Sequence, residues 1–272
     1  MENIEIRDSL CCWCDLLGYG APFVESSWDL LNPRCKKNFE RIERLRLLFT
    51  TTLSVKQVGT KLSFNDGFAN TIDITPLNTE SYMETLLFLE GVIQDFDSLN
   101  TTDKREGFPG ARGVLTIGQR FSYDCCNHSF DLISERTTAY YPKDFQMNTA
   151  FSKAFIMEES GSRAEIKGSN LYIDNAVFDF LKSAAVKINC ELPVFEEQGD
   201  DIVVKLFSSK GWFADIHLDS KPIIYGKSEK YDNRGIETIL YRYKSIHSII
   251  DEIASEAAYQ QAYRYSLMED DE

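Results

Sequence analysis

The order in which two apolar periodicities alternate along the chain constrains its fold most. Residues 10–17 are apolar and strand-like, and the stripe of an amphipathic helix follows over residues 33–53. Residues 61–74 alternate polar and apolar side chains on both sides of Asn65-Asp66-Gly67, which is typical of a hairpin. A second helical stripe covers residues 81–97. The chain therefore begins with a strand, a helix, a hairpin and a helix.

Three further segments complete the expected core. Residues 113–118 predict a short buried strand, residues 144–160 a helix that opens with Asp144, and residues 176–185 another helix. Up to residue 160 the segments give the order β-α-β-β-α-β-α, and residues 176–185 add a further helix. This order favours an α+β fold with a ferredoxin-like βαββαβ core and with its helices on one face of the sheet.

The rest of the chain predicts a C-terminal strand and helix extension. Strands are expected near residues 202–207 and 212–217, and a long helix from about Ile236 to Tyr265. No flexible boundary separates this part from the core. We therefore expect one domain over residues 1–272, with its core at about 8–190 and the extension at about 191–272.

The charge balance excludes several classes of partner. The chain carries 29 basic and 43 acidic residues, a formal net charge of -14. A nonspecific grip on a nucleic acid polymer or on an anionic membrane is not expected from such a surface. The start lacks a basic and then apolar signal, and no apolar run reaches the roughly 18 residues that span a bilayer. These features predict a cytoplasmic protein with no membrane contact.

Cysteine usage agrees with that compartment. The seven cysteines are odd in number and lack paired CxxC spacing, so we expect reduced thiols that pack in the core. They are Cys11, Cys12, Cys14, Cys35, Cys125, Cys126 and Cys190.

Two aspartates stand where metal chemistry could occur. Asp15 lies where the first strand meets a glycine-rich loop, and Asp66 lies at the tip of the hairpin that neighbours that strand. Carboxylates this close repel unless cations lie between them, and oxygen ligands suit Mg²⁺ or Mn²⁺. The alternative is that Asp15 caps a turn and Asp66 serves only the hairpin.

The residues after Asp15 suit a phosphate group. Gly18 and Gly20 would let backbone N–H groups approach triphosphate oxygens before the helix near Pro33 begins. A lone GxG is weak evidence. Its position three and five residues after Asp15 would place phosphate beside metal.

Four motifs in this order resemble the class III nucleotide cyclases. Asp15-Leu16-Leu17-Gly18-Tyr19-Gly20 is similar to the D-[IL]-x-G-[FY] strand end of that family, and Phe64-Asn65-Asp66-Gly67 to its metal-binding hairpin. Arg112 to Gly118 is similar to the R-G-x-[IL]-[ST]-x-G strand, and Met147-Asn148-Thr149-Ala150 to the V-N-x-A helix. The resemblance spans about residues 8–175.

The resemblance implies a role for each matching residue. Two Mg²⁺ or Mn²⁺ ions per site would be held by Asp15, Asp66 and the backbone carbonyl of Leu16. The segment Gly18, Tyr19 and Gly20 would meet the phosphates. Asn148 would orient the ribose, although a solvent-facing polar residue of the helix is an equal alternative.

The chain also departs from the family pattern. Ser152 stands where the family has an arginine that stabilises charge on the reacting phosphate. Lys153 and Arg120 are the two candidates to replace that arginine. Leu62 stands where a base-reading lysine is expected, and the adjacent Lys61 is the candidate substrate-binding residue in its place. A chain without the purine signature resembles the bacterial pyrimidine cyclases of anti-phage defence, which make cyclic UMP or cyclic CMP.

The resemblance implies a reaction and an assembly. The expected enzyme is a phosphorus–oxygen lyase that converts an NTP, with UTP or CTP favoured, into a 3',5'-cyclic mononucleotide and pyrophosphate. Sites at the interface of a homodimer are implied. Two alternatives stay open: a degenerate nucleotide sensor without turnover, and a palm-type cyclic oligonucleotide synthase, although the GGDEF or GGDD hairpin of that class is lacking.

Overall fold

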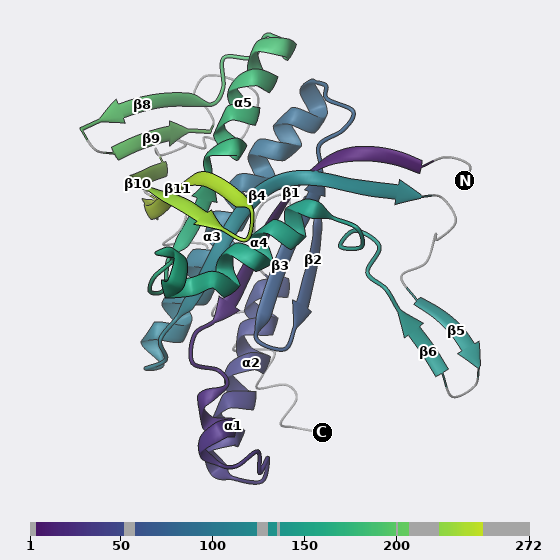
Figure 1. The fold of residues 1–272 in the computed structure, drawn as a ribbon, viewed down its shortest axis with the longest axis vertical. Helices are drawn as coiled ribbons and strands as arrows, with labels where there is room; N and C mark the ends of the chain where they lie inside the picture. The colour runs from purple at the N-terminus through teal and green to yellow at the C-terminus, as the bar shows by residue number, and fades with distance from the viewer. Residues whose placement is uncertain are drawn as a thin grey trace.

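A computed structural model describes most of the chain (Figure 1). The described residues are 4–51, 58–123, 130–134, 137–199, 201–206 and 223–246. They form an α+β fold around one nine-stranded sheet, and a separate two-stranded ribbon extends from it. The α+β class expected from the sequence is confirmed.

The first four strands of the large sheet have the ferredoxin-like arrangement. They are β1 (Ile4–Leu16), β2 (Thr60–Phe64), β3 (Gly67–Asp73) and β4 (Ala111–Tyr123). Their order across the sheet is β2-β3-β1-β4, and each neighbouring pair is antiparallel. The helices α2 (Pro33–Thr51) and α3 (Thr79–Arg105) make the two crossovers, so the expected βαββαβ core is confirmed.

The sheet continues past β4 with five more strands. The order there is β7-β11-β10-β9-β8, and β7 pairs with β4 in parallel. The strands are β7 (Leu171–Asp174), β8 (Val194–Gln198), β9 (Asp201–Lys205), β10 (Ile223–Asn233) and β11 (Ile236–Ile246). The C-terminal strands therefore extend the same sheet as the core, and the boundaries expected within the domain stay a prediction.

Helices cover both faces of the sheet, which corrects the expectation that they share one face. The even-numbered residues of β1, such as Leu10 and Cys12, pack with α2, α3 and α5 (Asn175–Ile188). The odd-numbered Cys11 and Trp13 pack instead with the start of α4 (Thr149–Ser160). Because successive side chains of a strand point to opposite faces, an apolar β1 needs cover on both.

Helix α4 begins five residues later than expected. Asn148 has an extended backbone (φ -100°, ψ 106°), and its side-chain oxygen accepts a hydrogen bond from Phe151 N–H at 3.0 Å. It is therefore the N-cap that precedes the helix, and not a residue within it. Met147 before it has a positive φ of 47°, which no helix can include. Asp144 lies outside the helix.

The C-terminal helix expected from Ile236 is wrong over the residues that the structure describes. Ile236–Ile246 is β11, which forms a hairpin with β10. Leu240 packs on the α4 face of the sheet, and Tyr241 and Tyr243 pack on the opposite face. Aromatic and β-branched residues with this alternation favour a strand. Residues 247–265 of that helix and the strand expected at 212–217 lie outside the described residues.

Several smaller elements complete the description. They are α1 (Ala21–Glu25), the ribbon strands β5 (Phe130–Ser134) and β6 (Thr137–Tyr140), and a 3₁₀ turn at Gly161–Ala164. Cys11, Cys12, Cys14 and Cys35 are buried free thiols and Cys190 is half-buried and free, while Cys125 and Cys126 lie outside the described residues. Within the part that the structure describes, none of the helices combines the length and apolarity needed to cross a bilayer.

Candidate functional site

The structure brings Asp15 and Asp66 together at one end of β1. Asp15 lies directly opposite Gly67 of β3, and the backbone N–H of Leu16 donates a 3.1 Å hydrogen bond to the carbonyl of Asp66. Their carboxyl groups also come within hydrogen-bonding reach of each other. The two acids, 51 positions apart in the sequence, therefore face each other across neighbouring strands.

The local backbone fixes this hairpin tip. Asn65 adopts a positive φ of 52° at the turn, a conformation that asparagine tolerates better than most residues. A Cβ at Gly67 would lie 2.0 Å from the indole ring of Trp13, so only glycine fits there. The close packing of Trp13 against Gly67 holds the turn over the end of β1 and keeps Asp66 beside Asp15.

Burial disfavours the ionised forms of Asp15 and Asp66, and nearby negative charge adds to this at Asp15. Burial, followed by the charges of Glu158 and Asp66, raises the pKa of Asp15 to about 8, although Arg112 and Arg41 act in the opposite direction. Burial also raises the pKa of Asp66 from its usual value. An acid whose pKa is raised by nearby acids is one that an added cation would stabilise.

The nearest guanidinium groups are committed to other carboxylates. Arg41 is buried and binds Asp103 through Nε and Nη2, both at 2.7 Å. Arg112 stands opposite Asp15 on β4, yet its Nε and Nη2 contact Glu158 Oε1 at 2.8 and 2.6 Å. Asp15 and Asp66 therefore share negative charge that no ion pair of the described residues neutralises.

Side chains of α2 hold the loop after β1 in place. Gly18 has a positive φ of 73°, Arg41 Nη2 donates to the carbonyl of Leu17 at 3.0 Å, and Asn38 Nδ2 donates to that of Tyr19 at 2.6 Å. The Tyr19 ring packs edge-on against Phe23. The segment Gly18, Tyr19 and Gly20 is thus a fixed turn next to Asp15, as the sequence predicted.

Leu16 and Gly20 flank that turn. The Leu16 carbonyl accepts a long 3.4 Å hydrogen bond from Tyr19 N–H, which leaves one of its lone pairs for another partner. Gly20 precedes α1, and a Cβ there would meet no atom within 4 Å. Open space beside the backbone at Gly20 is compatible with a ligand above the turn.

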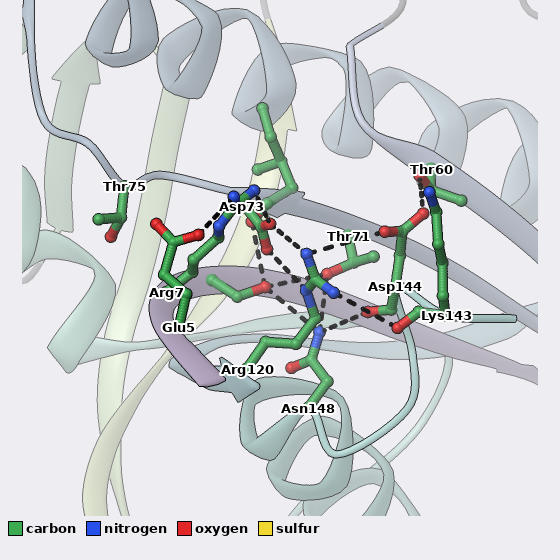
Figure 2. A network of polar contacts seen from close by, with 12 residues as sticks. Glu5, Arg7, Thr60, Thr71, Asp73, Thr75, Arg120, Lys143, Asp144 and Asn148 are labelled. Carbon is green, nitrogen blue, oxygen red and sulfur yellow. Dashed lines mark hydrogen bonds and ion pairs between the residues drawn. The ribbon is translucent and has the colours of Figure 1, made fainter. Parts of the chain in front are cut away.

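Asn148 lies far from this site within the same chain. Its Nδ2 donates to Thr71 Oγ1, Ser9 Oγ and the Asp144 carbonyl at 3.1, 3.3 and 3.0 Å (Figure 2). Ser9 and Asp15 are six residues apart on β1, which corresponds to about 20 Å. Asn148 is buried at 1% exposure, so it is not the solvent-facing helix residue of the alternative either.

Lys61 also lies apart from the two aspartates. Its Nζ contacts Asp95 of α3 at 2.9 Å and donates to the carbonyl of Phe49 at 2.8 Å. Asn70, its partner on β3, binds the same Asp95. These contacts place Lys61 on the α2 and α3 face of the sheet, whereas Asp15 is on the α4 face.

The two cations considered as substitutes for the missing arginine have other partners. Arg120 makes a two-pronged ion pair with Asp73 and is 7% exposed, and Figure 2 shows Arg7 and Asp144 around it. Lys153 Nζ donates to the carbonyl of Ile117 at 3.2 Å. Ser152 Oγ donates back to the carbonyl of Asn148 at 3.1 Å, within α4.

Three charged residues near the site were missed by sequence reasoning: Arg41, Asp103 and Glu158. Each occupies a position on the buried stripe of its helix, where an apolar residue is expected. Glu158, for example, lies four residues after Ala154 and eight after Ala150, both fully buried. A charge on an apolar stripe is the signal that would have found them, because such a charge needs a buried partner.

The donor set fits a hard divalent cation. Two facing carboxylates and the Leu16 carbonyl provide oxygen ligands of the kind that Mg²⁺ and Mn²⁺ prefer. Among the described residues, no cluster of three or more His, Cys, Asp or Glu side chains is arranged to hold a metal ion. Any ion here would thus depend on Asp15 and Asp66, with the remaining positions left for substrate oxygens and water.

Comparison with known proteins gives a structural likeness only. No protein-family model matches the chain, and no curated protein sequence does. Adenylyl cyclase CyaB from P. aeruginosa is similar over 91% of this chain and 99% of its own, with 11% identity and a TM-score of 0.46.

Two guanylyl cyclase domains give similar values. The guanylate cyclase domain of RhGC from Catenaria anguillulae, in complex with GTP, covers 89% of this chain and 100% of its own, at 10% identity and a TM-score of 0.46. A dimeric guanylyl cyclase domain of RhoGC from Blastocladiella emersonii covers 90% and 100%, at 12% identity and 0.43. Likeness at this level assigns no role to any residue of this chain.

Proposed function

We propose that this chain is a metal-dependent nucleotide cyclase that converts a nucleoside triphosphate into a 3',5'-cyclic mononucleotide and pyrophosphate. The observation that carries the proposal is the pair Asp15 and Asp66, which face each other with raised pKa values while the nearby arginines bind other acids. Such a pair would bind a divalent cation in place of its protons, and a triphosphate brings one.

The residues of the site would share the work as follows. Asp15 and Asp66 hold the ions, with the Leu16 carbonyl as a further oxygen ligand. The fixed turn at Gly18, Tyr19 and Gly20 positions the phosphates through its backbone. Bound Mg²⁺ or Mn²⁺ supplies Lewis acidity at the attacking 3'-hydroxyl and charge neutralisation at the triphosphate.

Completion of the site by a second copy is part of the proposal. Asn148 lies about 20 Å from Asp15 in the same chain, so a role in orienting the ribose requires Asn148 of a partner subunit. A homodimer with two equivalent interface sites meets that requirement.

Base choice and biological role are the finer parts of the proposal. Leu62 replaces the base-reading lysine, and Lys61 is engaged by Asp95 on the far face of the sheet. We therefore favour UTP or CTP over a purine nucleotide, with the cyclic product acting as a cytoplasmic signal in anti-phage defence. Lys61 is part of the proposal as the substrate-binding lysine, and Asp95 holds its Nζ in this structure.

A nucleotide sensor without turnover is the second candidate. It is favoured by Ser152, which leaves α4 without the expected arginine. It is also favoured by the Asn148 side chain, whose oxygen caps α4 and whose amide nitrogen donates to Thr71. In that case Asp15 and Asp66 would bind a metal–nucleotide complex without chemistry. The same test separates the two candidates.

The test is incubation of the purified full chain with each of the four NTPs and Mn²⁺, with products identified by mass. A cyclic mononucleotide from one NTP, absent with D66A, supports the cyclase. Tight NTP binding without product supports the sensor, and linear or cyclic oligonucleotides support a palm-type synthase. A matched control is D29A, which changes an exposed aspartate outside the site.

A further inference from the structure

We propose that Glu158 is a positioning residue whose hold on Arg112 keeps the carboxylate of Asp15 available for a divalent cation. The inference rests on the proposed metal site at Asp15 and Asp66 and adds a residue that the sequence motifs do not include. The pairing of β1 with β4 places a competing positive charge opposite Asp15.

The competing charge is the guanidinium group of the residue opposite Asp15. Arg112 of β4 is its direct cross-strand partner in the register of β1 and β4. Directly opposed side chains have Cβ atoms about 5 Å apart on the same face of the sheet, and opposite charges in that position attract. A free Arg112 would therefore form an ion pair with Asp15 and occupy the place of a metal ion.

Glu158 removes that competitor. It lies in the last turn of α4, on the face of the sheet that carries Arg112. Its Oε1 accepts from Nε at 2.8 Å and contacts Nη2 at 2.6 Å, and the side chains of Glu158 and Arg112 are 5% and 16% exposed. A buried, charge-assisted pair of this kind is strong and geometrically defined.

The end of α4 reinforces the same orientation. A Cβ built on Gly161, the C-cap of α4, would lie 3.4 Å from both terminal nitrogens of Arg112. The guanidinium is thus packed against the C-terminus of the helix, where the helix dipole favours a cation. Glu158 and the helix end together hold Arg112, and Asp15 faces Asp66 instead.

The experiment is a double-mutant cycle on Mn²⁺ affinity, measured by calorimetry and by electron paramagnetic resonance of free Mn²⁺ without nucleotide. We expect E158Q to weaken Mn²⁺ binding at least tenfold, because the neutral amide releases Arg112 toward Asp15. We expect R112Q/E158Q to bind within threefold of the wild type, because the competing cation is gone. The matched control E159Q breaks the exposed pair with Arg234 and should leave affinity unchanged.

Three outcomes decide the inference. Equal Mn²⁺ affinity in E158Q and wild type, in protein shown to be folded by its thermal melt, would overturn it. A double variant as weak as E158Q would also overturn it, because the loss would then not pass through Arg112. If D15N binds Mn²⁺ as the wild type does, the metal site itself is wrong, and the inference falls with it.

Discussion

The two ends of β1 place acids and arginines side by side with opposite results. At the Ser9 end, Arg120 and Arg7 balance Asp73, and Asn148 joins two strands and the start of α4 (Figure 2). At the Asp15 end, two acids face each other while Arg41 and Arg112 are bound elsewhere. Charged groups that are all paired, as at the Ser9 end, indicate a structural role. Carboxyl groups without a cationic partner, as at the Asp15 end, indicate a place for a ligand.

The largest effect should come from neutralising both acids at the Asp15 end of β1. D15N/D66N should lower turnover of an NTP at least about a thousandfold, because the ions that activate the hydroxyl and neutralise the triphosphate lose their ligands. The fold should survive, since the change removes like-charge repulsion. Turnover by mass spectrometry and the thermal melt check this, and a double variant with more than a tenth of wild-type activity would contradict it.

Removing an arginine at the Ser9 end should lower the stability of the fold. R120A leaves Asp73 with the more distant Arg7 alone, so we expect the free energy of unfolding to fall by about 2 to 4 kcal/mol. Mn²⁺ affinity of the folded protein should stay within twofold of wild type. Urea unfolding and calorimetry measure the two quantities, with the exposed pair variant R34A as a control that should cost under about 1 kcal/mol.

Asn148 gives a sharper test of the same comparison. N148A removes the N-cap of α4 and should lower the free energy of unfolding by about 1 to 2 kcal/mol. N78A removes the comparable cap of α3 and serves as its control. If Asn148 also reaches a partner's site, N148A should lower turnover at least tenfold while N78A does not; equal turnover in the two variants would confine Asn148 to structure.

The last expected effect is a dependence on pH. The folded pKa of Asp15 is raised to about 8, above the ordinary value near 4, so folding favours the protonated acid. Its stabilising contribution is complete below about pH 4 and is lost as pH rises to about 8. At pH 8, D15N should therefore be more stable than metal-free wild type, and no more stable at pH 4.

Urea unfolding at the two pH values measures this difference. D29N, which changes an exposed aspartate, should show the same stability as the wild type at both. A D15N variant that is less stable than the wild type at pH 8 would mean that Asp15 is ionised and paired in the folded protein.

The contrast between the two ends also explains what the sequence could predict. The strand at 10–17, the hairpin around Asp66 and the stripes of α2 and α3 all carry a local period, and all were found. Asp15 and Asp66 were paired in advance because strand order alone brings a hairpin next to the first strand. The other residues around these two aspartates were not predicted. Arg41 and Glu158 reach the site from helices, and no local sequence pattern encodes how those helices pack.

Two errors have a related cause. Residues 144–148 follow the apolar period of the helix, but Asn148 competes for a backbone N–H as a cap and starts α4 later. Residues 236–246 contain apolar side chains at spacings that fit either a helix or a strand. Pairing of β11 with β7 and β10 decides for the strand, and such pairing is a property of the whole sheet.

The central claim is that Asp15 and Asp66 bind divalent ions together. The most direct measurement is Mn²⁺ binding to wild type, D15N and D66N at pH 8, by electron paramagnetic resonance with no nucleotide present. The account predicts saturable binding to the wild type and at least a tenfold loss in each single variant. Binding that is unchanged in both variants would contradict it.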